Sequence, residues 1–235
     1  MNSIASQLDL AKRRAAEKAV ELVAGNYVVG LGSGSTAAYA IRALGRRVQE
    51  EGLKILGIPT SHQALLEAAR SGVPITTLDE HPTLDIAIDG ADELDHNLNL
   101  IKGGGGALTR EKIVASAAKR YIIIADERKL VRRLGQKNAI PIEVIPFALP
   151  TILKSLKDLG FKVKLRAGSG KVGPVMTDNA NLLLDIYCKG LEDPEQLDSQ
   201  LRRLPGIVET GLFIRMADAA YLGRLKGGVR KLSHR

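Results

Sequence analysis

Strands and helices are expected to alternate along the first half of this chain, and this rhythm limits the folds open to it. The apolar run Tyr27–Leu31 is typical of a buried strand, residues 32–36 form a glycine-rich turn, and residues 37–44 follow with helical spacing. Such alternation predicts a mostly parallel sheet with helices on both faces. The same reasoning predicts helices over residues 4–22, 63–71 and 111–120, and strands over residues 54–58, 75–78, 84–88 and 121–125.

Beyond about Leu134 the order of elements changes. Strands are expected at 142–147, 162–166, 182–187 and 208–213, with helices at 149–159 and 194–204. The order β-α-β-β-α-β is that of a small ferredoxin-like domain. We therefore predict an α/β protein with a mostly parallel, Rossmann-like sheet domain (1–134 plus 214–235) and a smaller α+β ferredoxin-like domain (135–213).

The net charge of +8 and the pI near 9.6 indicate an anionic partner. Aromatic residues make up only 3% of the chain, tryptophan is absent, and no helix-turn-helix, zinc-finger or RNA-binding signature is found. We therefore expect a phosphorylated small molecule and no nucleic acid. The basic residues of the tail, 226–235, are expected at the solvated surface.

No apolar stretch approaches the roughly 18–20 residues that cross a bilayer, and residues 1–14 read as a polar helix rather than a signal peptide. We expect no membrane association. The single cysteine, Cys188, cannot form an internal disulfide. The chain is therefore expected to be cytoplasmic, in a reducing compartment.

The turn Gly32-Ser33-Gly34-Ser35-Thr36 lies where a strand gives way to a helix. Backbone amides and hydroxyls there face the positive end of the helix dipole, which suits an anion. The dinucleotide fingerprint fails because Ser35 stands where a third glycine is required, and the P-loop lysine is missing. The alternative is that Ser35 or Thr36 only caps a helix.

Acidic residues follow the predicted strand at 84–88, in the run Asp89-Gly90-Ala91-Asp92-Glu93-Leu94-Asp95. Ligands of open α/β sheets bind at the carboxyl ends of the strands, where this run is expected. A magnesium site at Asp89 and Asp92 and a solvated acidic turn are the alternatives. A calcium loop beginning at Asp95 fails, because Leu100 and Gly106 stand where glycine and glutamate are needed.

A lysine and four consecutive glycines, Lys102-Gly103-Gly104-Gly105-Gly106, precede a predicted helix that carries Glu111. Glycine leaves backbone amides open to a ligand, although a flexible surface loop is the alternative. Thr109 is expected to cap the helix, which puts Glu111 in a first turn that stabilises a carboxylate whatever its function. Lys129 follows another strand at the ligand edge, where a lone lysine is often only solvated. The four histidines have no metal-binding spacing.

Four motifs taken in order resemble ribose-5-phosphate isomerase, type A. They are GLGSGST at 30–36, DGADE at 89–93, KGGGGALTREK at 102–112 and PIEVIP at 141–146, and the likeness runs from about Leu10 to Leu222. The resemblance implies interconversion of ribose 5-phosphate and ribulose 5-phosphate without cofactor or metal. It also leads us to expect a homodimer or homotetramer.

The resemblance further implies the roles of individual residues. Glu111 would accept the proton, with Asp89, Asp92 and Lys102 assisting catalysis. An aldose becomes a ketose when a base moves a proton from C2 to C1 through an enediolate, so one carboxylate suffices. A non-catalytic sugar-phosphate sensor, a metal-dependent isomerase and a coenzyme-A transferase are the competing hypotheses. The residues expected to bind substrate are Ser33, Gly34, Ser35, Thr36, Asp89, Gly90, Ala91, Asp92, Lys102, Gly103, Gly104, Gly105 and Lys129, with Lys12 as a weaker candidate.

Overall fold

The computed structural model describes residues 4–168, 170 and 172–234. The chain divides into two compact units, which are described separately. The first comprises Met1–Ala91, Arg110–Lys129 and Met216–Arg235, and the second comprises Asp92–Thr109 and Leu130–Arg215. The domain limits expected from the sequence differ, because they put residues 92–109, 130–134 and 214–215 in the first domain; those limits stay a prediction.

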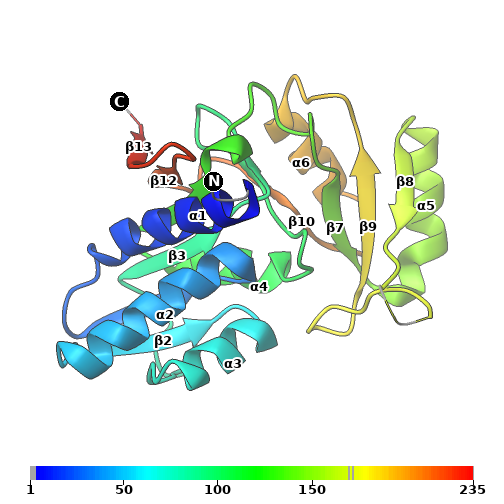
Figure 1. Cartoon of the computed structure of the whole chain (residues 1–235). Helices are drawn as coiled ribbons and strands as arrows, with labels where there is room; N and C mark the ends of the chain where they lie inside the picture. The colour runs from blue at the N-terminus through cyan, green and yellow to red at the C-terminus, as the bar shows by residue number, and fades with distance from the viewer. Residues whose placement is uncertain (1–3, 169, 171, 235) are drawn as a thin grey trace. The chain divides into compact units, whose positions relative to one another are not determined.

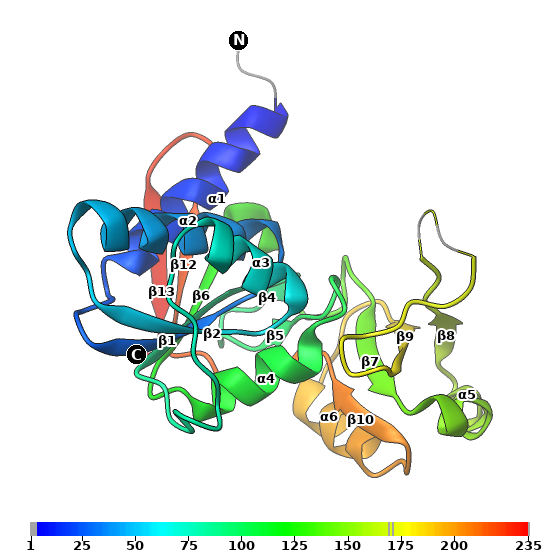
Figure 2. The same ribbon diagram turned by 90° about the horizontal axis from the view of Figure 1, so that it is seen from below.

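The first unit is built on a six-stranded sheet in the order β13-β12-β6-β3-β1-β2 (Figures 1 and 2). All neighbours are parallel except β12 and β13, which form an antiparallel hairpin. The α/β fold predicted from the alternation is therefore confirmed. Its strands are β1 (Tyr27–Leu31), β2 (Ile55–Pro59), β3 (Ile86–Gly90), β6 (Tyr121–Asp126), β12 (Ala219–Gly223) and β13 (Val229–Ser233).

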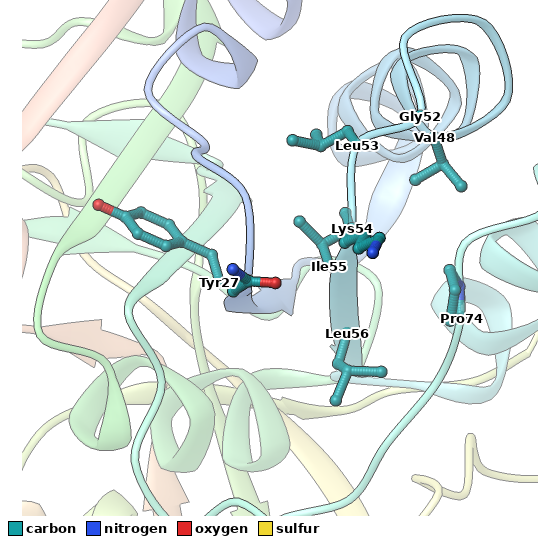
Figure 3. Close-up of a pocket in the computed structure, with 9 residues that line it drawn as sticks. Tyr27, Val48, Gly52, Leu53, Lys54, Ile55, Leu56 and Pro74 are labelled. Carbon is teal, nitrogen blue, oxygen red and sulfur yellow. The ribbon is translucent and has the colours of Figure 1, made fainter.

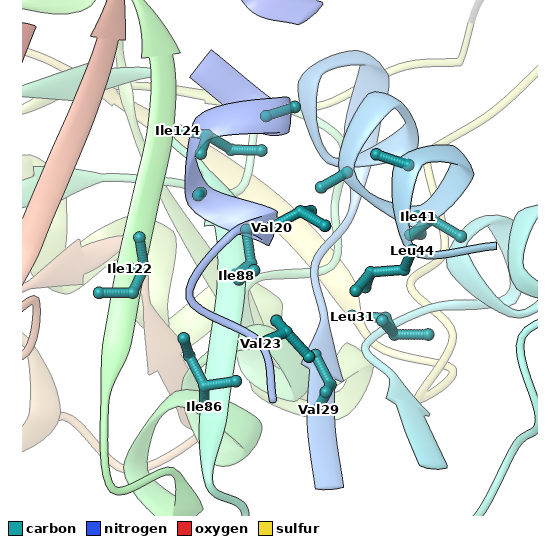
Figure 4. Packing of buried hydrophobic residues seen from close by; sticks show 14 of the residues in the cluster. Val20, Val23, Val29, Leu31, Ile41, Leu44, Ile86, Ile88, Ile122 and Ile124 are labelled. Atoms are coloured by element: carbon teal, nitrogen blue, oxygen red, sulfur yellow. The ribbon is translucent and has the colours of Figure 1, made fainter. Parts of the chain in front are cut away.

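Helices cover both faces of this sheet. On one face α1 (Ile4–Val20), α2 (Gly34–Glu50) and α3 (His62–Arg70) share a core with the strands, part of which is drawn in Figure 4. Small alanines on α1 and α2 let these helices approach the sheet, where isoleucines and valines of the strands fill the space. On the other face lies α4 (Leu108–Ala117) (Figure 2). A Cβ built on Gly30 of β1 would lie 2.6 Å from Cγ1 of Val114, so this α4 side chain stands directly over that glycine.

Three sequence expectations for this unit were wrong in detail. Residues 75–78 form no strand, and only Ile75 bridges to Gly57 of β2. The second helix extends to Glu50, because Arg47 in its last turn donates to carbonyls of the α1–β1 connection. Strand β3 is shifted by two residues, so that Asp89 lies within it rather than after it.

The second unit holds a four-stranded antiparallel sheet in the order β10-β7-β9-β8. With α5 (Leu149–Asp158) and α6 (Pro194–Arg202) packed on one face, this is the predicted ferredoxin-like order (Figure 1). A second, three-stranded sheet, β11-β5-β4, was not predicted. The strands are β7 (Ile140–Val144), β8 (Lys162–Leu165), β9 (Leu182–Tyr187), β10 (Ile207–Thr210), β4 (Glu93–Leu94), β5 (Leu100–Ile101) and β11 (Leu212–Phe213).

The predicted strand at 208–213 is in fact two strands in two sheets. Gly211 separates β10 from β11, and its amide donates to the carbonyl of Pro141 at 2.6 Å. A Cβ there would lie 2.4 Å from the carbonyl oxygen of Lys102, so only glycine allows this close approach.

The chain returns to the first unit after residue 215, where β12 pairs with β6. The tail adds β13 at the sheet edge, with Arg230 and Lys231 exposed as expected. Within the described residues, no helix combines the length and the apolar character that crossing a bilayer requires.

Candidate functional site

Asp89 lies at the carboxyl end of β3, where backbone amides at the ends of β1 and β3 bind its side chain. Its Oδ1 accepts hydrogen bonds from the amides of Ser33 at 3.1 Å and Gly90 at 2.7 Å, and only 2% of the residue is exposed. A Cβ on Gly32 would lie 2.1 Å from that same oxygen, so the absence of a side chain at Gly32 makes room for the carboxylate. These bonds fix one carboxylate oxygen as an acceptor.

The glycine-rich turn leads directly into α2, with Ser33 as its extended N-cap residue. The Ser33 side chain makes no capping bond, and Ser35 and Thr36 lie inside the first turn, so neither caps the helix. Gly34 takes φ +91°, which favours glycine. Lys12 of α1 brings its Nζ to 3.3 Å from Ser35 Oγ, so a cation, a hydroxyl and the helix N-terminus meet here.

A group of hydroxyls behind this turn was missed by the sequence analysis. Ser33 Oγ lies 2.8 Å from Thr60 Oγ1 and 2.5 Å from Ser61 Oγ, both just after β2. Ser61 also caps α3, and Gln63 of that helix accepts from the amide of Gly34 at 2.7 Å. The contact joins the turns that follow β1 and β2. The position of Thr60 and Ser61 directly after a predicted strand was the signal available in the sequence.

Glu111 is buried on the face of α4 that packs on the sheet. It precedes Val114 by one helical turn and is 5% exposed. Because Val114 stands over β1, Glu111 lies over the carboxyl-end side of the same strands, where Asp89 is found. Burial raises the pKa of Tyr121 on β6 well above its usual value, and the negative charges of Asp89 and Glu111 raise that pKa further. Tyr121 was not among the residues predicted from the sequence.

Thr109 is not the cap of this helix, contrary to expectation. The helix begins at Leu108, and the Thr109 hydroxyl instead donates to Glu143 Oε2 at 2.5 Å. Glu111 nevertheless lies in the first turn, as predicted.

In the second unit, Asp92 and the glycine run are in direct contact. The amide of Gly104 donates to Asp92 Oδ2 at 2.7 Å, and the amide of Asp92 donates to the carbonyl of Ile101 at 2.8 Å. Lys102 is 3% exposed, and its Nζ lies 5.6 Å from the centre of the Phe213 ring. Gly104 and Gly105 are exposed, whereas Gly103 and Gly106 are buried, so the middle of the run is open to a ligand.

The structure says less about the remaining candidates from the sequence, which are Lys129 and the possible metal sites. Lys129 ends the short 3₁₀ turn Glu127–Lys129 after β6 and is half-buried. Asp95 accepts from the amides of Asn97 and Asn99, which is a local turn rather than a calcium loop. Among the described residues, no group of three or more His, Cys, Asp or Glu side chains is arranged to hold a metal ion.

A cavity of about 510 Å³ lies elsewhere on the first unit, among the residues of Figure 3. It is lined by Tyr27, Leu53 and Ile55 at the start of β1 and β2, and by Val48 and Pro74. Ligands of parallel sheets bind at the carboxyl ends of strands, and this cavity lies at the opposite ends. We therefore do not assign it to the candidate site.

The fold and these side chains define a class: an α/β protein whose sheet edge presents a helix N-terminus suited to an anion, together with buried carboxylates. Comparison with known proteins narrows the class. The model of ribose 5-phosphate isomerase A (phosphoriboisomerase A) matches residues 56–227. The ribose-5-phosphate isomerase A of Methanosarcina acetivorans is 48% identical over 219 residues, covering 93% of this chain and 92% of the relative. That of Methanothermobacter thermautotrophicus is 49% identical over 216 residues, covering 92% and 95%.

Solved structures agree with the sequence relatives. The ribose 5-phosphate isomerase A of Methanocaldococcus jannaschii superposes with a TM-score of 0.91 at 44% identity, covering 95% of this chain and 98% of that one. A D-ribose-5-phosphate isomerase in complex with phospho-erythronic acid superposes with a TM-score of 0.94 at 43% identity, covering both chains fully. The chain belongs to the ribose 5-phosphate isomerase A family, as its motifs predicted.

Proposed function

We propose that this chain interconverts ribose 5-phosphate and ribulose 5-phosphate through an enediolate, with Glu111 as the proton acceptor and donor. Family membership supports the overall reaction. The observation that carries the residue assignment is the burial of Glu111 on α4, over the sheet edge that holds Asp89. A sensor without catalysis would have no use for a buried base at that place.

The reaction asks for a base that moves one proton between neighbouring carbons. Glu111 takes the proton from C2 of the open-chain aldose, and the electron pair forms the C1–C2 double bond of the enediolate. The same carboxyl group then returns the proton to C1, while the hydroxyl proton on O2 is transferred to O1, so that the C1 oxygen ends as a hydroxyl and the C2 oxygen as the ketone. Because the proton comes back from the same group, no oxidant, reductant or cofactor is required.

Negative charge develops on the substrate oxygens in the enediolate and needs donors that are already oriented. We assign this task to Lys102 and to the amides of Gly103, Gly104 and Gly105. Asp89 and Asp92 orient the sugar hydroxyls and assist opening of the ring.

The phosphate binds the amides and hydroxyls of the turn before α2, at Ser33, Gly34, Ser35 and Thr36. Lys12 supports this assignment, since its ammonium lies 3.3 Å from Ser35 Oγ. Lys129 and the backbone of Gly90 and Ala91 complete the proposed binding residues.

The ligand of one related structure suits this scheme. Phospho-erythronic acid, found in a D-ribose-5-phosphate isomerase, is a phosphorylated four-carbon sugar acid. Its carboxylate is planar and anionic, as an enediolate is, so a site built for the intermediate would hold it. We expect this compound to compete with ribose 5-phosphate for the present chain.

Proton transfer is tested by running the reaction in D₂O with excess chelator. We expect deuterium at C1 of ribulose 5-phosphate, because a carboxyl proton exchanges with solvent before it returns, and full activity without free metal. Mass spectrometry of the product and a coupled rate assay supply the two readings. Product without deuterium, together with activity that disappears on chelation and returns with magnesium or manganese, would reassign Asp89 and Asp92 as metal ligands.

Two further expectations from the sequence stay predictions. A homodimer or homotetramer is to be measured by sedimentation of the purified protein. A cytoplasmic location is to be measured by fractionation of the source cells.

A further inference from the structure

Arg166 connects the glycine run to the sheet of the second unit. Arg166 follows β8, and its backbone amide donates to the Leu183 carbonyl at 2.9 Å. Its Nη1 donates to the carbonyl oxygens of Gly103 at 2.8 Å and Gly104 at 3.1 Å. The other side of the guanidinium is held by Asp185 of β9, with Nε 2.9 Å from Oδ2 and Nη2 bonded to Oδ1. One planar group therefore ties two consecutive peptide carbonyls to a strand in the domain core.

The orientation of those carbonyls determines where the next amides point. In a trans peptide the C=O and the N–H of one unit point in opposite directions, and the described chain has no cis peptide bond. With the Gly103 carbonyl on Arg166, the Gly104 amide points away from it and reaches Asp92 Oδ2 at 2.7 Å. With the Gly104 carbonyl on Arg166, the Gly105 amide likewise points away. A Cβ built on exposed Gly105 would meet no atom within 4 Å, so this residue faces open space.

Glycines need such an external constraint more than other residues do. Each ordered backbone unit costs about 1–2 kcal/mol of conformational entropy, and glycine loses the most. Hydrogen bonds from a guanidinium are charge-assisted, stronger than neutral ones, and withdraw electrons from the peptide, which strengthens its N–H as a donor. The Arg166 and Asp185 side chains are 17% and 14% exposed, so solvent weakens the clamp little. The paired Asp185 carboxylate balances the charge that Arg166 brings.

We propose that Arg166, oriented by Asp185, is a positioning residue for the isomerase reaction: it fixes two peptides so that the Gly104 amide holds Asp92 and the Gly105 amide faces the enediolate. This inference rests on the proposed function, which assigns Asp92 and the glycine amides to the substrate. It extends that function because the sheet of the second unit, through Asp185 and Arg166, would set the orientation of these amide donors.

The test replaces Arg166 with lysine, which keeps the charge and loses the two-sided planar fork. We expect kcat to fall about 10–100-fold with a smaller change in KM, since the lost donor geometry matters most when charge develops on oxygen. Hydrogen exchange of the Gly104 and Gly105 amides should accelerate in the same variant. The exchange reading does not depend on activity, so it separates failure of this inference from failure of the proposed reaction, which wild-type turnover tests.

Arg202 is the matched control within the same unit. It also pairs with two carboxylates, Nε with Asp198 at 2.8 Å and Nη2 with Glu209 at 2.6 Å. In the part of the chain that the structure describes, its side-chain bonds go to these two residues and not to the glycine run. Arg202→Lys should leave kcat and the exchange of the two glycine amides unchanged.

A second variant keeps the proposal testable if Arg166→Lys does not fold. Asp185→Asn leaves the arginine in place but replaces its carboxylate partner with a neutral amide, so an intermediate loss of kcat and an intermediate exchange rate are expected. Wild-type kcat and wild-type exchange in folded Arg166→Lys would overturn the proposal. If Arg166→Lys does not fold, the same two wild-type values in Asp185→Asn would overturn it.

Discussion

Replacing Gly32 with alanine tests whether Asp89 can assist catalysis only when the residue after β1 has no side chain. A Cβ at this position would lie 2.1 Å from Asp89 Oδ1, 2.3 Å from its Cγ and 2.5 Å from its Cα. A new side-chain rotamer of Asp89 could relieve the first two contacts but not the third, which is with backbone. To bring the Cα from 2.5 Å to an ordinary contact of 3.4 Å, the ends of β1 and β3 must separate by about 0.9 Å.

A displacement of this size has two measurable costs. Forcing an extra carbon into a packed interior typically lowers the free energy of unfolding by about 1–3 kcal/mol. Misplacing a reacting group by about 1 Å can cost about 10²-fold in rate. We therefore expect Gly32→Ala to lower kcat/KM about 100-fold, measured by a coupled isomerase assay, and to unfold at lower urea concentration.

Two other glycines serve as controls for this variant. A Cβ on Gly25 would meet nothing within 4 Å, so Gly25→Ala should change neither quantity. A Cβ on Gly45 would lie 2.1 Å from the carbonyl oxygen of Ser71, between α2 and α3, so Gly45→Ala should lose stability but keep the kcat/KM of the folded enzyme. Wild-type kcat/KM in Gly32→Ala would refute the assignment of Asp89, and an equal loss in Gly45→Ala would mean that general destabilisation explains the effect.

Three further changes give simpler readings. Glu111→Gln should lower kcat about 10²–10⁴-fold with little change in substrate affinity, and retention of more than a third of kcat would end its catalytic assignment. Ser35→Ala combined with Thr36→Val should raise KM more than it lowers kcat, because the phosphate does not react; equal protection of this variant and wild type by phosphate against thermal unfolding would place the anion elsewhere. The hydrogen-bonded Lys119 ammonium, followed by a backbone amide, lowers the pKa of Asp85 below 3.8. This interaction stabilises the fold above the unfolded-state pKa and is lost as the pH falls through the folded-state pKa, so Asp85→Asn should unfold at lower urea concentration than wild type at pH 7, by a small margin because solvent screens the exposed Lys119; an undiminished deficit in strong acid would contradict this cause.

Local sequence pattern was sufficient to predict most of the fold. β1 and β9 were predicted with the bounds they have, because each is a mainly apolar run that begins directly after an asparagine. The pattern failed where pairing partners decide the structure. Residues 75–78 have the composition of a strand but make only one bridge, and the short β4 and β5 exist because they pair with each other and with β11.

The candidate site was predictable to the extent that its residues fall in motifs. Asp89, Glu111 and the glycine run could be named from sequence because each stands next to an element boundary. Tyr121 and Arg166 could not, because a tyrosine that starts a strand and an arginine that follows one carry no signal until the fold shows their surroundings.

The pairing of β12 with β6 has a consequence for how the protein is made. Synthesis proceeds from the N-terminus at about 5–20 residues per second, and β12 begins only at Ala219, after the whole of the second unit. Until then β6 has β3 on one side and a bare strand edge on the other. That edge is apolar and unpaired, so until β12 is made the nascent first unit is open to pairing with the strand of another chain. The second unit, apart from residues 92–109, is one continuous segment, Leu130–Arg215, and is complete before the first.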